Sequence, residues 1–309
     1  MKKIIFMGTP EIAVPTLEKL NEKYKIEAVV TVPDKPKGRG LQLLPSPVKE
    51  KALQLGLKIL QPENLKENNF INQIAEISPD IIVVFAFRIL PAEVYKLAKI
   101  ASFNTHTSLL PKYRGAAPIN WAIINGEKTS GLTSFILNDK VDTGSILLQR
   151  QVDIPSNFTA GELYNLLMEN APQFAVDTCE LLLSGDYKLI IQDDSLATPA
   201  PKIFKQNAKI DWSKNANEIV NFINGYSPTP CAWTQWNSSQ LKIFRAISFD
   251  IDLENHNGAC YFHIYDDKFI IHCGVGAIEI LELQQEGKKK IKTSDFINGF
   301  RGNTTGNID

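Results

Sequence analysis

The chain has 309 residues, 44% hydrophobic and 22% charged, so it is long enough for two globular domains. Its formal net charge of −1 excludes a protein that grips nucleic acid by an overall positive surface, so any such contact must use local basic patches. The four cysteines show no paired spacing, and neither a signal peptide nor a run of membrane-span length is visible. We therefore expect a cytoplasmic protein.

The first 32 residues have the pattern of a β-α-β unit. Residues 4–7 and 26–32 are apolar and predict buried strands, and a helix begins near Pro10 between them. This order is typical of a doubly wound α/β domain. Gly8 stands alone where a dinucleotide-binding domain carries three spaced glycines, and no phosphate-loop Gly-Lys-Ser/Thr follows. These absences argue against an NAD enzyme or a nucleoside-triphosphatase.

Residues 33–47 form a stretch rich in proline and glycine, which predicts a long loop without secondary structure. The loop carries Lys35, Lys37 and Arg39, and leucines lie near its tip. Two interpretations stay open: a solvated basic loop, or an arm that contacts phosphates and packs its apolar tip on a partner.

A helix over 48–55, a strand over 57–60 and a helix over 70–76 come next, and residues 81–87 form an apolar strand buried on both faces. The strand leads into Phe87, Arg88 and Ile89. An aromatic, a cation and an aliphatic side chain at a strand end could form the wall of a pocket for a flat ring ligand. Equally, these apolar side chains could belong to the core.

Residues 100–103 predict the end of another buried strand, and Asn104 and His106 follow. The two residues are two positions apart, so their side chains point to the same side while the backbone is extended. An amide beside an imidazole suits acyl transfer, because both can donate to an oxyanion. The alternative is that His106 is a hydrogen-bonded structural residue.

The turn over residues 138–145, between predicted strands at 132–137 and 146–152, can add a carboxylate to this pair. Asp139 and Asp142 are both candidates for orienting His106. The sequence Asp142-Thr143-Gly144 also resembles the aspartic-protease signature, but it occurs once, and in an α/β setting.

The second half of the chain changes pattern. A long amphipathic helix over 163–183 contains Pro172, which predicts a kink or break. We expect a catalytic domain over residues 1–190, a linker over 191–207 and a C-terminal domain over 208–309. In the last of these, a helix at 216–223 precedes five short strands, the pattern of a small β-barrel of the OB-like kind.

Two clusters in the predicted barrel raise separate hypotheses. Lys288, Lys289 and Lys290 form a basic run, either a solvated hairpin or a contact for a nucleic-acid backbone. The cysteines and histidines at positions 260, 263, 272 and 273 suggest zinc, but neighbours at these spacings face opposite sides of extended strands. We therefore expect no metal site.

Three motifs in combination resemble the folate-dependent formyltransferase family: Asn104-x-His106, the stretch from Ser108 to Gly115, and Asp142-Thr143-Gly144. The resemblance implies a Rossmann-like, doubly wound parallel sheet and a catalytic triad of Asn104, His106 and Asp142, which selects Asp142 over Asp139. It also implies contacts to 10-formyltetrahydrofolate as the formyl-donor cosubstrate. These contacts are expected from Ser108, Leu109, Leu110 and Pro111, with Phe87, Arg88 and Ile89 as the pocket wall.

The loop at 33–47 and the C-terminal pattern resemble those of the family members that act on tRNA. This resemblance implies formyl transfer to the α-amino group of the methionine carried by initiator tRNA, without a metal or an evident protein partner. The expected tRNA contacts are Lys35, Lys37, Arg39, Lys288, Lys289 and Lys290. A formyltransferase for a sugar nucleotide or small amine is the alternative enzyme, and a tRNA-binding factor that has lost catalysis is the alternative from another class.

Overall fold

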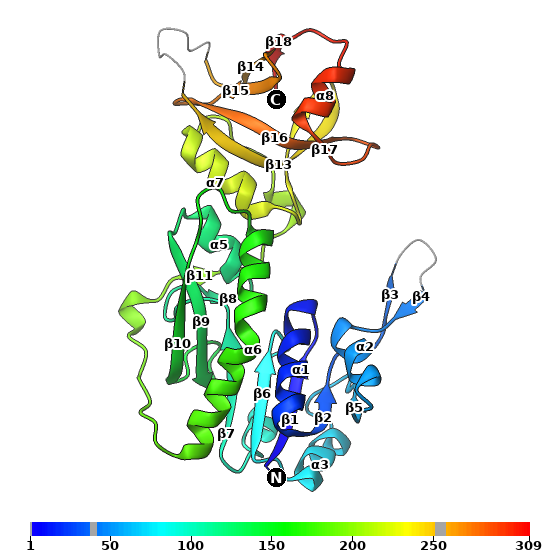
Figure 1. Cartoon of the computed structure of the whole chain (residues 1–309), viewed down its shortest axis with the longest axis vertical. Helices are drawn as coiled ribbons and strands as arrows, with labels where there is room; N and C mark the ends of the chain where they lie inside the picture. Colours follow the sequence, from blue (N-terminus) through cyan, green and yellow to red (C-terminus); the bar gives the residue numbers. More distant parts are fainter. Residues whose placement is uncertain (1, 38–41, 251–257) are drawn as a thin grey trace. The chain divides into compact units, whose positions relative to one another are not determined.

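The computed structural model describes residues 2–37, 42–250 and 258–309 (Figure 1). The chain forms two compact units, and each is built from several stretches of sequence. The first unit comprises Met1–Gly115, Ser130–Val152 and Tyr164–Pro199. The second comprises Ala116–Thr129, Asp153–Leu163 and Ala200–Asp309.

A seven-stranded sheet organises the first unit, with the strand order β10-β9-β7-β6-β1-β2-β5. Its strands are β1 (Lys3–Gly8), β2 (Lys25–Val30), β5 (Ile59–Leu60), β6 (Ile81–Phe85), β7 (Ala101–His106), β9 (Thr129–Ile136) and β10 (Ile146–Asp153). The five strands from β5 to β7 pair in parallel, and β9 pairs antiparallel with β7. The predicted α/β class is confirmed, and the sheet is mixed.

Helices cover both faces of this sheet because its strands are apolar on both sides. Those of the first unit are η1 (Glu11–Ala13), α1 (Val14–Lys23), α2 (Pro47–Gln54), α3 (Asn68–Ile77), α4 (Ala92–Tyr95) and α6 (Ala160–Ser184), with η2 (Asp194–Leu196) beyond them. Phe70 and Val94, from α3 and α4, pack against one face. Helices α1 and α6 lie side by side (Figure 1), and Lys23 pairs with Glu180 between them. Of the predicted kink or break at Pro172, the break does not occur, since α6 continues through this residue.

The stretch that the sequence predicts as an unstructured loop contains a short hairpin, β3 (Lys35–Lys37) and β4 (Gln42–Leu44), which extends away from the sheet in Figure 1. Its base is fixed by side chains. Lys49 Nζ donates to Asp34 Oδ2 over 2.6 Å, and Gln61 Nε2 donates to Asp34 Oδ1 over 2.9 Å. With both ends held, the short extended segments satisfy their backbone groups by pairing with each other.

Antiparallel strands form the core of the second unit, in the order β12-β13-β16-β15-β14-β18, with β17 also paired to β16. These strands are β12 (Ala232–Trp236), β13 (Ser239–Phe249), β14 (Tyr261–Tyr265), β15 (Lys268–His272), β16 (Ala277–Gln285), β17 (Ile291–Lys292) and β18 (Thr305–Asn307). The remaining elements of the chain are β8 (Arg114–Gly115), α5 (Pro118–Ile124), β11 (Pro199–Ala200), η3 (Lys205–Asn207), α7 (Ala216–Tyr226) and α8 (Thr293–Gly299). The five predicted strands are all present, and the sheet is a curled half-barrel.

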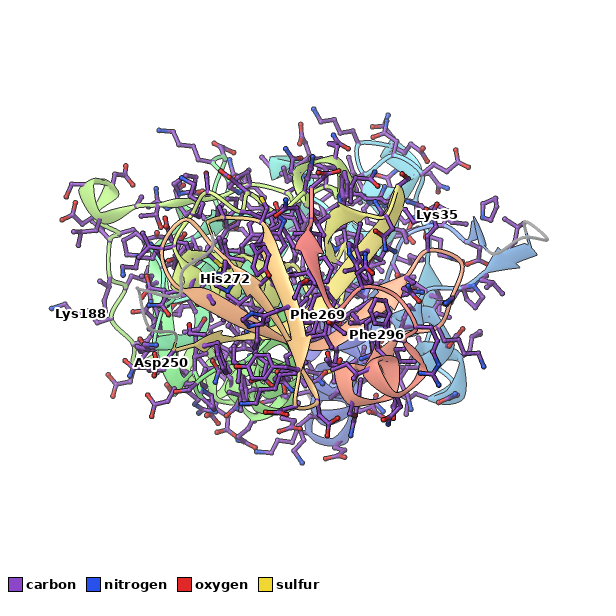
Figure 2. The ribbon with its side chains drawn as sticks, turned by 90° about the horizontal axis from the view of Figure 1, so that it is seen from above. Lys35, Lys188, Asp250, Phe269, His272 and Phe296 are labelled. Atoms are coloured by element: carbon purple, nitrogen blue, oxygen red, sulfur yellow. The ribbon has the colours of Figure 1, made fainter. Side chains whose placement is uncertain are left out.

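Aromatic side chains fill this half-barrel. Trp236 contacts Phe262, Phe269 and Phe296, with ring centroids 5.4–5.7 Å apart. Phe269 on β15 and Phe296 on α8 stack at 5.9 Å, and both are labelled in Figure 2. Helix α8 therefore closes over the core through Phe296, which is 5% exposed.

Two features are absent from the residues that the structure describes. Among them, no helix is both long enough and apolar enough to span a bilayer. Within the same ranges, no three His, Cys, Asp or Glu side chains are grouped so that they could hold a metal ion. The rings of His263 and His272 lie 5.2 Å apart in perpendicular orientation, as aromatic neighbours.

Candidate active site

Strand β7 presents the predicted amide and imidazole. It extends to His106, beyond the predicted end at 103, and it lies between β6 and β9. Because strand side chains alternate, Asn104 and His106 share one side of the sheet and Thr105 points to the other. Asn104 is half-buried, whereas His106 is 6% exposed. A central strand thus holds both groups on rigid backbone.

The contacts of His106 define its tautomer. Its Nε2 lies 2.8 Å from the backbone oxygen of Tyr113. Because a carbonyl oxygen only accepts, Nε2 carries the hydrogen and donates it. The other ring nitrogen, Nδ1, lies 3.8 Å from Asp142 Oδ2, an ion-pair distance when the ring is charged. The ring nitrogen that is free to gain or lose a proton is therefore Nδ1, the one beside Asp142.

Backbone geometry fixes the Asp142 carboxylate. Oδ2 accepts a hydrogen bond from the Gly115 amide over 2.9 Å. Gly115 has φ +126°, a value that favours glycine, and Asp142 has φ +55°. At Gly144, a Cβ atom would overlap the carbonyl oxygen of Ile136, so the turn needs a glycine there. Turn geometry thus explains the glycine of the Asp-Thr-Gly sequence.

The other predicted carboxylate, Asp139, is engaged elsewhere. Its Oδ1 accepts the hydroxyl proton of Tyr95 over 2.6 Å. This hydrogen bond is the main cause that raises the pKa of Tyr95 to about 12. Of the two alternatives left open by the turn, Asp142 is the one placed beside His106.

The loop after β7 is held rigidly from within the sheet. Thr133 Oγ1 donates to Ser108 O over 2.7 Å and accepts from Leu110 N over 3.1 Å. Gln149 Nε2 donates to both Leu110 O and Thr133 Oγ1. The peptide bond before Pro111 is cis. These contacts hold the backbone of the predicted folate-binding stretch in one conformation.

The four side chains of this stretch differ in exposure. Ser108 is 1% exposed and donates its hydroxyl proton to Lys112 O, and Leu110 is 3% exposed and packs with Phe135. Leu109 and Pro111 are half-buried. Leu109 and Pro111 are therefore the side chains that this loop leaves partly accessible.

The predicted pocket wall leaves the same edge of the sheet. Strands β6 and β7 are parallel neighbours and Phe85 is paired with Thr105, so the segments after both strands emerge together. Ile89 is 74% exposed. Arg88 turns back instead, donating to the carbonyls of Pro62 and Glu63, with its guanidinium 5.3 Å from the Phe87 ring centroid. Burial lowers the pKa of this guanidinium.

The predicted tRNA-binding residues belong to two separate groups. Lys35 and Lys37 lie in β3 of the first unit, and Lys35 is exposed and labelled in Figure 2. Arg39 lies outside the described residues. Lys288, Lys289 and Lys290 lie between β16 and β17 of the second unit and are exposed. Lys290 pairs with Glu282 over 2.7 Å, and Lys288 donates to Gln285.

The groups that hold His106 and Asp142 in place carry no recognisable sequence signature. The Tyr113 carbonyl and the Gly115 amide act through the backbone, which side-chain motifs do not reveal. Thr133 and Gln149 lie on other strands, and nothing in their local sequence marks them. The one signal present was the pliable Arg114-Gly115 pair.

Together, an amide, an imidazole of defined tautomer and a carboxylate on one sheet edge are the kinds of group that acyl-type transfer uses. Comparisons with known proteins identify the family within the group-transfer enzymes. The model of the Formyl transferase family matches residues 1–179, and that of the Formyl transferase C-terminal domain matches residues 202–301. The chain belongs to the formyl transferase family.

Individual relatives agree with this assignment along the whole chain. A protein of Clostridium novyi named methionyl-tRNA formyltransferase is 44% identical over 96% of each chain. Another of that name, from Chlorobium limicola, is 40% identical over 97% of this chain and 96% of its own. Among solved structures, an N-formyltransferase of Helicobacter canadensis in complex with folinic acid and dTDP-3-aminofucose shares the fold, with TM-score 0.70 and 23% identity. It covers 92% of this chain and 100% of its own.

Proposed function

We propose that this chain transfers the formyl group of 10-formyltetrahydrofolate to the α-amino group of methionine on initiator tRNA. The observation that carries the proposal is full-length identity of 40–44% with proteins named methionyl-tRNA formyltransferase, including the C-terminal domain. The triad supports an active enzyme over a tRNA-binding factor without catalysis. We also propose a cytoplasmic location, where charged tRNA is used.

In this reaction the amine is the nucleophile and the enzyme forms no covalent bond. The amine nitrogen bonds to the formyl carbon, and the bond from that carbon to N10 of the folate breaks. Asn104 and protonated His106 Nδ1 donate to the formyl oxygen while it carries negative charge. Such donors are worth about 3–4 kcal/mol each in related acyl-transfer sites.

Asp142 has two roles in the proposed mechanism. Its carboxylate lies 3.8 Å from Nδ1 and orients the imidazole ring. The amine nitrogen becomes positively charged as it bonds to the formyl carbon. Asp142 also accepts a proton from this nitrogen, directly or through water, and that proton ends on N10 of the leaving folate. The Gly115 amide keeps one carboxylate oxygen in place during this exchange.

The residues present suit a folate. A flat ring system needs an apolar lining with a few polar anchors, and the edge formed after β6 and β7 offers Phe87, Ile89 and Leu109. The backbone of the 108–111 loop is already fixed by Thr133. We propose this edge as the formyl-donor site. Ser108, Leu110 and Arg88 belong to the two segments that form it, and we propose that they contact the folate from there.

The tRNA contacts remain part of the proposal. Lys35 and Lys37, with Arg39, would meet the acceptor end of the tRNA, and Lys288, Lys289 and Lys290 would meet its backbone. We propose a catalytic part over residues 1–190 and a tRNA-binding part over 208–309. Of the expected linker 191–207, the residues up to Pro199 belong to the first unit.

The decisive assay offers the formyl donor to parallel acceptors: charged initiator methionyl-tRNA, charged elongator methionyl-tRNA, free methionine and a dTDP-amino sugar. We expect rapid transfer to initiator methionyl-tRNA and at most slow transfer to the others. His106→Asn serves as the catalytically impaired control. Preferred transfer to the amino sugar would replace this proposal with the sugar-nucleotide alternative.

A further inference from the structure

One buried side chain near Asp142 has no role in the chemistry above. Gln192 lies two residues after Ile190, which exchanges two backbone hydrogen bonds with Ile146. Although it lies in the stretch that the sequence predicts as a linker, Gln192 is 8% exposed. A buried amide must find its partners within the protein, because the water that would satisfy an exposed linker glutamine is excluded.

All four hydrogen-bonding positions of this amide are used. Nε2 donates to Asp142 O over 3.0 Å and to Gly144 O over 2.8 Å. Oε1 accepts from Nε and Nη2 of Arg114 over 3.1 and 2.8 Å. Because carbonyls only accept and a guanidinium only donates, the partners fix which way the amide is turned. A carboxylate would meet the two carbonyls with acceptors, so a neutral amide is required.

Gln192 bonds to the two segments that hold His106 and Asp142 in place, namely the one around Arg114 and the turn from Asp142 to Gly144. Arg114 lies between Tyr113 and Gly115 in sequence. The Tyr113 carbonyl accepts a hydrogen bond from Nε2 of His106, and the Gly115 amide donates one to the Asp142 carboxylate. On the other side, Gln192 bonds to the carbonyl of Asp142 itself. Asp142 has a left-handed backbone, which persists only where surrounding contacts define it.

We propose that Gln192 is a positioning residue for formyl transfer, a role that rests on the function proposed above. It clamps the Asp142–Gly144 turn to Arg114 and thereby sets the Asp142 carboxylate against the imidazole of His106. Arg114 keeps a second partner, Asp194, at 2.8 Å, but Asp194 is largely exposed. The Gly115 amide holds the Asp142 side chain, but the backbone carbonyls of Asp142 and Gly144 accept from Gln192 alone among the hydrogen bonds of the residues that the structure describes.

Two variants separate the halves of the clamp. Gln192→Met keeps the length of the side chain and removes both the donors and the acceptor. Gln192→Glu keeps acceptors for Arg114 and removes the donors to Asp142 and Gly144. Gln54→Glu, at an exposed position in α2, is the matched control for the charge change. Thermal melting selects a temperature at which every variant is folded.

We expect kcat to fall about ten- to hundredfold in both Gln192 variants, because small misplacements of reacting groups carry large rate penalties. KM for folate and tRNA should stay within about twofold, since neither substrate is bound by the clamp. The control should match the wild type. Normal turnover in both variants would overturn the proposal, and normal turnover in Gln192→Glu alone would reduce the role of Gln192 to anchoring Arg114.

A second measurement does not depend on turnover. Amide hydrogen exchange, followed by NMR, reports the Gly115 N–H that donates to Asp142. In Gln192→Met we expect faster exchange at Gly115 and unchanged exchange at Val83 in the core of β6. Equal acceleration at both sites would indicate general destabilisation and refute a positioning role. If the wild type formylates no tRNA, the proposed function fails, while exchange at Gly115 still decides whether the clamp exists.

Discussion

Two polar regions of the first unit, the cluster around His106 and the hairpin β3–β4, are held by different kinds of contact. Around His106, a buried imidazole, a carboxylate and the backbone of 113–115 hold one another through two hydrogen bonds and one contact of 3.8 Å. The hairpin is fixed at its base by Asp34, Lys49 and Gln61, and Lys35 further along is exposed.

The difference follows from what each region has to do. Stabilising an oxyanion requires donors aimed at one place before the reaction starts, so position must be defined in advance. Attraction of a phosphate backbone depends on charge and tolerates movement, so exposed lysines on an anchored stem are sufficient. Mutations should therefore affect the rate in the first region and salt-dependent binding in the second.

The largest effect should come from breaking the cluster itself. His106→Asn removes the group that can carry positive charge, and we expect kcat to fall about 10³-fold. Asp142→Asn keeps an acceptor for the Gly115 amide and loses the negative charge, so we expect a smaller fall, about 10²-fold. Steady-state kinetics with initiator methionyl-tRNA measures both. Near-normal turnover in both variants would remove the triad assignment.

A smaller effect should follow from loosening the loop 108–111, the proposed folate-binding stretch. Thr133→Val preserves shape but leaves Ser108 O and Leu110 N without this partner, so we expect a stability loss of about 1–3 kcal/mol. Roughly tenfold lower kcat/KM for the folate should accompany it. Denaturant unfolding and initial rates test the two parts.

Thr16→Val is the control for this change. Thr16 is also fully buried, but its hydroxyl has no hydrogen-bond partner among the described residues. The control should retain full activity and stability. Equal losses in the two variants would contradict a specific role for Thr133.

In the second region, the double variant Lys35→Ala/Lys37→Ala should raise KM for tRNA severalfold and leave KM for folate unchanged. Each phosphate contact that is lost should lower the slope of log affinity against log salt by about 1. Lys58→Ala/Lys66→Ala removes the same charge from exposed positions elsewhere in the first unit. A salt slope that is the same in both double variants would exclude a direct phosphate contact at the hairpin.

The smallest effect concerns the base of the hairpin. Hydrogen bonds from Lys49 and then Gln61 hold the pKa of Asp34 below its ordinary value of 3.8. The ionised carboxylate therefore stabilises the fold above pH 3.8, and this contribution is lost as the pH falls through the lower folded value. Asp34→Asn should melt below the wild type near neutral pH, with the gap closing in acid. A gap that is independent of pH would contradict the assignment.

Local sequence determined much of this molecule. Apolar runs and their spacing were sufficient to predict the parallel strands and the five short strands of the second unit. They also predicted that Asn104 and His106 share one side of their strand, because side-chain periodicity follows directly from backbone geometry. The motif resemblance supplied the family, which the comparisons confirm.

Tertiary structure decided what periodicity cannot encode. The sequence left Asp139 and Asp142 open until the resemblance selected one, and the physical reason appears in the hydrogen bond from Tyr95 to Asp139. The pairing of β3 with β4 rests on a base held by Lys49 and Gln61, which lie outside the predicted loop. Helix α6 continues through Pro172, which the local sequence does not predict. Gln192 is the clearest case, because its amide partners are 48 to 78 residues away in sequence. A contact over such a separation leaves no trace in a local pattern and exists only when the sheet has assembled.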